Sequence, residues 1–280
     1  MNREKSSFSA AMPILESNRN QNVTLDRGDY VSLFRVSCLR LSSSVKLMSL
    51  KILLFLAVAA IPAYGASQPD TVRVDNLPMY GQPDIKRPDH LKQLDEHFIV
   101  NATKAFGSRE KASLNWYGQG EEFMNRGNAD MAMRRYNQSW LLNPESFLPY
   151  WGFGRALLAR KDCEGAIRQF ARARELVKAE PRKMALLSDS GVAYGYCATI
   201  TPPWQPELRK KHYENANRLF DESTRLDPAH AVAWYRWSQV LLQQGRAQEA
   251  WEKVRRAQSG GYPVPDDYLA RLRKRMPQPK

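Results

Sequence analysis

Cysteine and histidine are scarce in this sequence, whose 280 residues include only three cysteines and four histidines. The histidines are dispersed, without the spacing that ligands of one metal ion need. A glycine-rich phosphate loop, a nucleophile elbow and a helical metal-binding motif are missing as well. The sequence therefore predicts no catalytic residue, no metal site and no cofactor, and so a protein that is not an enzyme.

The apolar run Ile52–Ala60 is too short to span a bilayer comfortably. A short basic start precedes it, and the small residues Ala63 and Gly65 follow at the positions that a signal peptidase requires. Residues 48–65 are therefore predicted to be a signal peptide, cleaved near Gly65–Ala66, which would export the chain to a bacterial periplasm without a stable transmembrane span. An uncleaved membrane anchor is the alternative. A lipid anchor is not expected, because no cysteine follows the run.

Residues 1–47 are rich in serine, asparagine and arginine and have no clear helical period. Export signals normally lie at the N-terminus. We therefore expect translation to start at Met48 and residues 1–47 to be a non-native extension. Residues 66–86 are punctuated by proline, aspartate and glycine, which predicts a flexible leader.

The chain has a formal net charge of +13. Its basic residues form four clusters: Arg134-Arg135, Arg209-Lys210-Lys211, Arg255-Arg256 and Arg271 to Arg275. One hypothesis is that these clusters attract anionic components outside the cytoplasm, such as lipid headgroups, wall polymers or acidic proteins, with no role for nucleic acid. The alternative is that they serve solubility and complement the charge of helix C-termini.

One pattern of residue sizes occurs four times between residues 112 and 260. In each copy a small residue follows a large one by four positions. Further along the same copy, a bulky residue follows an alanine by four positions. The large residues are Trp116, Tyr150, Leu187 and Trp234, and the small ones are Gly120, Gly154, Gly191 and Ser238. The alanines are Ala132, Ala166, Ala216 and Ala250, and the bulky residues after them are Tyr136, Phe170, Phe220 and Val254. Small residues let two helices approach while large ones fill the seam, so each copy predicts a pair of packed helices.

This pattern resembles the tetratricopeptide repeat (TPR). The resemblance implies an all-α fold, a right-handed superhelical solenoid of about four helix pairs at residues 113–146, 147–183, 184–230 and 231–262. Such a stack leaves an apolar face at each end. We therefore expect a capping helix at 87–107 and another, followed by a tail, at 263–280. The alternative is an ordinary helical domain with scattered alanines and aromatics.

The third repeat departs from the period. Its small residue and its alanine are 25 positions apart, against 12 in the other three copies. This difference predicts an inserted loop at 198–210, which its prolines stiffen and in which Trp204 lies near the middle. The loop is interpreted either as a protruding contact for a partner or as a strap whose tryptophan packs on the repeats.

Two cysteines, Cys163 and Cys197, fall at the same edge of the predicted solenoid, in neighbouring repeats. An exposed thiol in an oxidising compartment is most easily understood if it is paired. We therefore predict a Cys163–Cys197 disulfide, with two unpaired thiols as the alternative.

In the family that the chain resembles, the first helix of each pair lines a concave groove. The resemblance implies that the groove of this chain is aromatic and polar. The residues carried over to it are Tyr117, Glu121, Asn125, Trp151, Arg155, Asp189, Tyr196, Tyr235, Arg236, Gln239 and Gln243. The Lys/Asn clamp that some members use for a peptide C-terminus is missing.

The implied function is a non-catalytic protein-interaction adaptor in the cell envelope, which binds a protein or peptide segment in this groove. Two alternatives remain open. One is an accessory subunit of an envelope assembly, secretion or cytochrome maturation machine. The other is a protein that contacts anionic lipid or wall polymer through a basic convex face.

Overall fold

The structure is a computed structural model and describes residues 73–178 and 182–279. The predictions for the N-terminal extension at 1–47, for the signal peptide at 48–65 and for the leader before residue 73 concern residues outside these ranges. Within the described residues the chain is helical and contains no strand. None of these helices is both long enough and apolar enough to cross a membrane.

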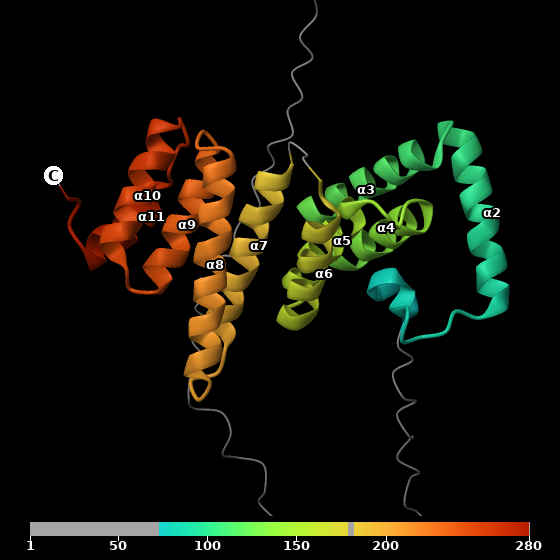
Figure 1. Cartoon of the computed structure of the whole chain (residues 1–280), viewed down its shortest axis with the longest axis horizontal. Coiled ribbons are helices and arrows are strands. Elements are labelled where there is room, and N and C mark those ends of the chain that lie inside the picture. Colours follow the sequence, from blue (N-terminus) through green and yellow to red (C-terminus); the bar gives the residue numbers. More distant parts are fainter. Residues whose placement is uncertain (1–72, 179–181, 280) are drawn as a thin grey trace, which may run out of the picture. The chain divides into compact units, whose positions relative to one another are not determined.

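Two short 3-10 helices, η1 (Val74–Asn76) and η2 (Pro78–Gly81), precede the α-helices. The α-helices are α2 (Asp89–Phe106), α3 (Arg109–Asn125), α4 (Ala129–Leu142), α5 (Phe147–Ala159), α6 (Cys163–Leu176), α7 (Lys183–Ile200), α8 (Pro206–Leu226), α9 (Ala231–Gln243), α10 (Ala247–Ser259) and α11 (Asp266–Arg275). They pack most extensively as successive pairs, α3 with α4, α5 with α6, α7 with α8 and α9 with α10 (Figure 1). The predicted all-α solenoid of four helix pairs is confirmed.

In the first three repeats the glycine of the first helix admits a ring from the second helix of the same repeat. A Cβ atom added to Gly120 would lie 2.3 Å from the Tyr136 ring, and one added to Gly154 would lie 2.9 Å from the Phe170 ring. These distances are shorter than real contacts of a Cβ atom, so glycine lets each ring pack directly on the opposite backbone. The small residues of the sequence pattern and the bulky residues that follow its alanines are thus the two sides of one contact.

The turns inside three of the repeats share one backbone conformation. Gly127, Lys161 and Gly245 follow the first helix of repeats one, two and four, with φ of 74°, 65° and 77°. The side chains of Asn128 and Asp162 then accept hydrogen bonds from the backbone N–H groups of the next helix. A left-handed residue followed by an N-cap therefore fixes these short connections.

The third pair differs from this scheme, and it corrects the prediction of a loop at 198–210. Most of the extra residues lengthen the helices, since α7 has 18 residues and α8 has 21, against 13 each for α9 and α10. Only residues 201–205 connect α7 to α8, because Pro206 stands in the first turn of α8, where its missing N–H is not needed. Trp204 lies in this connection and is 79% exposed, so it is not packed on the repeats.

The leader also differs from the prediction, because residues 73–81 are held against α4. Asn137, a fully buried residue of α4, donates its amide to the carbonyl oxygens of Asp75 and Leu77 at 3.0 and 2.8 Å. Its amide oxygen accepts from the backbone N–H of Tyr80 at 3.3 Å. Arg160 adds a bond to the carbonyl of Asn76 at 2.6 Å. A buried amide thus supplies hydrogen bonds to the backbone of a segment that its prolines and glycines had predicted to be flexible.

Candidate protein-interaction site

Several residues carried over to a concave groove instead connect neighbouring repeats. Glu121 of α3 forms an ion pair with Arg155 of α5, and it also accepts a hydrogen bond from the Tyr136 hydroxyl at 2.6 Å. Arg155 is only 6% exposed. This contact joins the first helices of repeats one and two.

A second set of contacts continues the series into repeats three and four. The Trp151 indole of α5 donates to Asp189 of α7 at 2.8 Å, and Arg236 of α9 pairs with the other oxygen of Asp189 at 2.7 Å. The side chains of Asp189 and Arg236 are 8% and 11% exposed. We call Glu121, Arg155, Trp151, Asp189 and Arg236 the polar ladder. It links the first helices of all four repeats in order.

Electrostatics within the ladder favours the charged form of Arg155. Burial disfavours the charged guanidinium of Arg155, but the neighbouring carboxylates of Glu121 and Asp189 outweigh burial and raise its pKa. Burial, followed by the charge of Glu121, holds the pKa of the Tyr117 and Tyr136 hydroxyls well above the usual value. Both tyrosines therefore stay neutral while Glu121 and Arg155 stay paired.

The ladder corrects the picture of an open aromatic and polar groove. Glu121, Trp151, Arg155, Asp189 and Arg236 contribute to packing between repeats. Tyr235 is buried as well, packed on Tyr262 and Tyr268, and Gln239 donates to its hydroxyl at 2.8 Å. The remaining groove candidates are accessible to different degrees: Tyr117 and Tyr196 are partly buried, and Asn125 and Gln243 are exposed.

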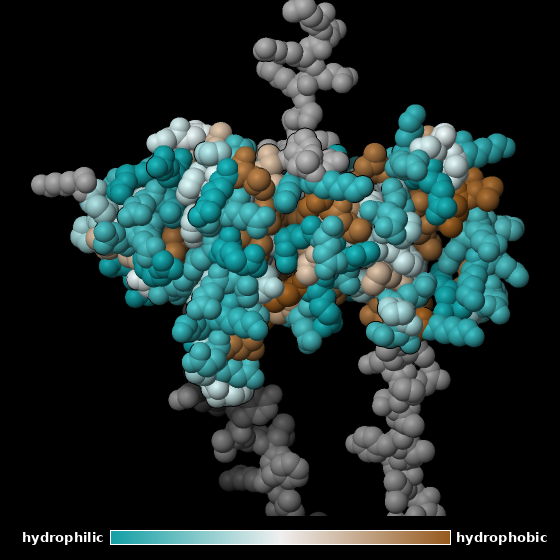
Figure 2. Space-filling model, in the orientation of Figure 1, coloured by the Kyte–Doolittle hydropathy of each residue, from teal (hydrophilic) through white to brown (hydrophobic). Residues whose placement is uncertain are grey.

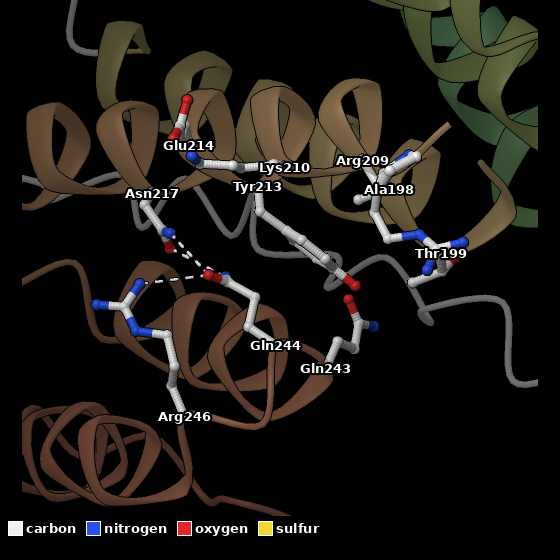
Figure 3. Close-up of a pocket in the computed structure, with 11 residues that line it drawn as sticks. Ala198, Thr199, Arg209, Lys210, Tyr213, Glu214, Asn217, Gln243, Gln244 and Arg246 are labelled. Atoms are coloured by element: carbon white, nitrogen blue, oxygen red, sulfur yellow. Dashed lines mark hydrogen bonds between the residues drawn. The ribbon is translucent and has the colours of Figure 1, made fainter. Parts of the chain in front are cut away.

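Gln243 borders a cavity of about 840 Å³, which we call the polar pocket. Helices α7 and α8 and the turn between α9 and α10 supply its walls (Figure 3). Its polar side chains are Thr199, Arg209, Lys210, Tyr213, Glu214, Asn217, Gln243, Gln244 and Arg246. Three of these are cations and one is a carboxylate, and Arg246 also pairs with Glu249 of α10 at 2.5 Å. The remaining excess of positive charge favours anionic groups.

Hydrogen bonds order one wall of the polar pocket. The Asn217 amide donates to the Gln244 side-chain oxygen at 3.0 Å, and Arg246 donates to the same oxygen at 3.3 Å (Figure 3). The Trp237 indole holds Asn217 in turn, at 3.0 Å. Lys210 and Gln243 are exposed at the rim. Fixed amides beside exposed donors suit a carboxylate or the backbone of an extended peptide.

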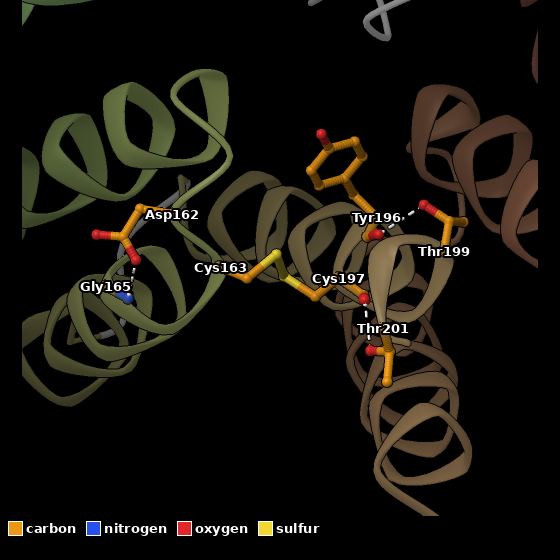
Figure 4. Close-up of a disulfide and its surroundings, with 7 residues drawn as sticks. All are labelled: Asp162, Cys163, Gly165, Tyr196, Cys197, Thr199 and Thr201. Atoms are coloured by element: carbon orange, nitrogen blue, oxygen red, sulfur yellow. Dashed lines mark hydrogen bonds between the residues drawn. A yellow bond between two sulfur atoms is a disulfide. The ribbon is translucent and has the colours of Figure 1, made fainter. Parts of the chain in front are cut away.

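The predicted disulfide is present and joins repeats two and three (Figure 4). Cys163 lies at the first position of α6 and Cys197 near the end of α7, with Cα atoms 5.6 Å apart. Asp162 caps α6 by accepting from the Gly165 N–H at 2.9 Å, which positions the turn that carries Cys163. The prediction of a Cys163–Cys197 bridge is therefore confirmed.

The basic clusters on the second helices differ in availability. Arg134 pairs with Asp75 at 3.1 Å, and the Arg135 guanidinium lies 4.9 Å from the Trp116 ring centre. Both cations are thus engaged inside the molecule, whereas Arg255 and Arg256 are exposed. A continuous basic convex face is not supported by this arrangement. In the described residues no group of three or more His, Cys, Asp or Glu side chains is placed to hold a metal ion.

No family model matches the chain. No curated protein matches it either. Among solved structures the chain is similar to the crystal structure of MamA, with 16% sequence identity and a TM-score of 0.41 over 66% of this chain and 99% of the MamA chain. A likeness at this distance carries no inference about function.

Proposed function

We propose that this protein is a non-catalytic adaptor of the cell envelope that binds a segment of a partner protein in the polar pocket. The observation that carries the proposal is the composition of that pocket, with amide and cationic side chains from two adjacent repeats around a cavity of about 840 Å³. Ordered amides pair with a peptide backbone, and guanidinium and ammonium groups pair with carboxylates. The partner segment is therefore expected to be extended and rich in Asp and Glu.

The pocket lies where two helix pairs meet. Helices α7 and α8 meet α9 and α10 there, and the polar ladder fixes α7 to α9 through Asp189 and Arg236. A rigid scaffold reduces the conformational entropy lost on binding. The ladder residues thus support the site without needing to touch the ligand.

Two observations support an envelope location. Residues 48–65 have the pattern of an export signal, and the Cys163–Cys197 disulfide is of the kind that persists in oxidising compartments. Acidic segments of envelope proteins are then the partners available to the pocket.

The first test measures peptide binding by fluorescence anisotropy. We expect a pool of random peptides rich in Asp and Glu to bind, and a pool rich in Lys and Arg not to bind. The double variant Lys210→Glu, Arg246→Glu should weaken acidic-peptide binding at least tenfold, since each lost charge-assisted contact contributes about 1.5–3 kcal/mol.

The matched control reverses two exposed cations on α10, Arg255→Glu and Arg256→Glu, with the same change in net charge. This variant should keep its affinity. An equal loss in both variants would mean that net charge alone drives binding, and no binding of acidic peptides would refute the proposed ligand class.

The second test locates the partner in cells with a photo-crosslinking amino acid at Gln243. The matched position is Asn125, an exposed groove candidate on the first repeat. A crosslinked protein recovered from the Gln243 position alone supports the polar pocket. Recovery from Asn125 alone would move the site to the first repeat.

A further inference from the structure

The connection between α7 and α8 carries a cluster of exposed apolar side chains. Ile200, Trp204 and Leu208 are 45%, 79% and 41% exposed, within residues 200–208. We call residues 200–211 the hairpin tip. Exposed apolar residues scattered singly need no explanation, but three of them within nine residues, with a tryptophan among them, indicate an interaction surface.

The long α7–α8 pair carries this tip beyond its neighbours. The lower ends of α7 and α8 reach farther than α9 and α10 (Figure 1). The extra length of α7 over α9 corresponds to roughly 8 Å at the rise of an α-helix. In the same orientation, hydrophobic surface is visible over this end of the pair (Figure 2). The tip is therefore a projection.

Hydrogen bonds hold the tip in one conformation. Arg209 donates to the carbonyl of Thr201 at 2.7 Å, across the connection. The Thr201 hydroxyl donates to the carbonyl of Cys197, also at 2.7 Å, and the Gln205 N–H donates to the carbonyl of Pro202 at 3.0 Å. The backbone that carries Trp204 is thus ordered, which reduces the conformational entropy lost on binding.

The charges beside the apolar cluster are mostly positive. Residues 200–211 contain Arg209, Lys210 and Lys211, with Glu207 as the one carboxylate. Lys210 and Lys211 are both exposed. The apolar surface continues into a cavity of about 530 Å³, which Ile200, Pro202 and Leu208 line together with the disulfide cysteines.

We propose that the hairpin tip docks the protein on a bilayer surface rich in anionic phospholipid. Trp204, Ile200 and Leu208 would enter the boundary between headgroups and acyl chains, the region where tryptophan is enriched in membrane proteins. Lys210 and Lys211 would pair with lipid phosphates. Peripheral binding is stable when an apolar signal and a basic signal act together, and the tip supplies both.

Binding is measured by flotation with vesicles of phosphatidylglycerol and phosphatidylethanolamine, against vesicles of phosphatidylcholine alone. The protein is isolated from cells, so that any processing has occurred. We expect wild-type protein to float with the anionic vesicles. Trp204→Ala should lower the partition coefficient about tenfold, from lost apolar burial. Lys211→Gln should lower it about fivefold, from one lost lipid contact.

Leu226→Ala is the matched control, because Leu226 is an exposed apolar residue at the opposite end of the same helix, α8. It should float like wild type. An absence of binding to anionic vesicles overturns the proposal, as does a loss in Leu226→Ala equal to that in Trp204→Ala.

Quenching by brominated phosphatidylglycerol reports directly on Trp204. We expect quenching of the tryptophan fluorescence in wild type and much weaker quenching in Trp204→Phe. Equal quenching in both proteins would show that the tip does not enter the bilayer.

The lipid proposal and the peptide proposal fail separately. Trp204→Ala should keep the affinity for acidic peptides. The double variant Lys210→Glu, Arg246→Glu is used only in the peptide-binding experiment. Loss of peptide binding without loss of vesicle binding in Trp204→Ala would make the tip a protein contact and overturn lipid docking.

Discussion

Trp151 of α5 donates its indole N–H to a carboxylate oxygen of Asp189 on α7, 2.8 Å away. Both residues are buried, and each belongs to the first helix of its repeat. The bond therefore crosses from the second repeat to the third. Because Asp189 also pairs with Arg236, one carboxylate holds three repeats together.

Replacing Asp189 by alanine leaves the Trp151 indole without its acceptor and the Arg236 guanidinium without its carboxylate partner. Breaking a buried ion pair by removing one partner costs about 3–5 kcal/mol. We expect the free energy of unfolding in urea, followed by circular dichroism, to fall by about 3 kcal/mol. Asp130→Ala is the control, since Asp130 pairs with Arg160 but is 61% exposed, and it should cost less than about 1 kcal/mol. Equal effects of the two substitutions would refute a structural role for the ladder.

Gly152 and Gly118 form a matched pair of helical glycines. A Cβ atom at Gly152 would lie 2.5 Å from the Tyr136 ring, whereas one at Gly118 would meet nothing within 4 Å. Gly152→Ala should therefore destabilise the protein by about 1–3 kcal/mol through overpacking. Gly118→Ala should stabilise it by up to about 1 kcal/mol through helix propensity. Thermal unfolding gives the two signs, and the same sign for both would contradict this packing.

Removal of the Cys163–Cys197 disulfide should lower stability by roughly 4 kcal/mol, the loop entropy of a cross-link across about 34 residues. Urea unfolding of the Cys163→Ser, Cys197→Ser variant measures the loss. In wild type, peptide mass spectrometry should find both cysteines alkylated only after reduction. Equal alkylation without reductant would show that the bridge does not form.

Asn137→Ala should release residues 73–81 from α4, because Asn137 supplies three hydrogen bonds to the backbone of that segment. We expect faster hydrogen exchange at Tyr80, whose N–H loses its acceptor, and faster tryptic cleavage after Arg73. Asn125→Ala, at an exposed asparagine, should leave both rates unchanged. Unchanged exchange at Tyr80 in Asn137→Ala would contradict the assigned contacts.

Burial, followed by the charge of Arg236, lowers the pKa of His230 below its ordinary value. Below about pH 6.5, His230 is protonated in the unfolded chain before it is protonated in the folded protein. The free energy of unfolding therefore falls as the pH decreases. Thermal unfolding between pH 7 and 5 should show a weaker pH dependence in His230→Gln than in wild type. His97→Gln, at an exposed histidine, should keep the wild-type dependence. A variant curve parallel to wild type would remove His230 as the cause.

The internal packing of each helix pair was predictable because its signal is local and repeated. Glycine at the position of Gly120 and a ring at the position of Tyr136 recur together in the first three repeats, and short-range helix geometry converts that spacing into a contact. The disulfide followed from the same register, since neighbouring repeats bring equivalent edges together. The prediction of a loop at 198–210 was wrong. Extra residues between the small residue and the alanine of a repeat can form either a loop or longer helices, and the repeat pattern does not distinguish the two.

The sequence did not predict which polar residues of the groove face are buried and which are exposed. Glu121 and Gln243 were both expected on the groove face of a first helix, yet Glu121 pairs with Arg155 and Gln243 is exposed beside the polar pocket. The sequence by itself determined the helix pairs and their register, because these depend on residue size at fixed spacing, and it placed the two cysteines at one edge of neighbouring repeats. Only the tertiary structure decided which polar side chains are paired between neighbouring repeats. It also decided that Asn137 holds residues 73–81 and that Trp204 projects into solvent. Those outcomes depend on which side chains meet across distant helices, and local periodicity carries no information about such pairings.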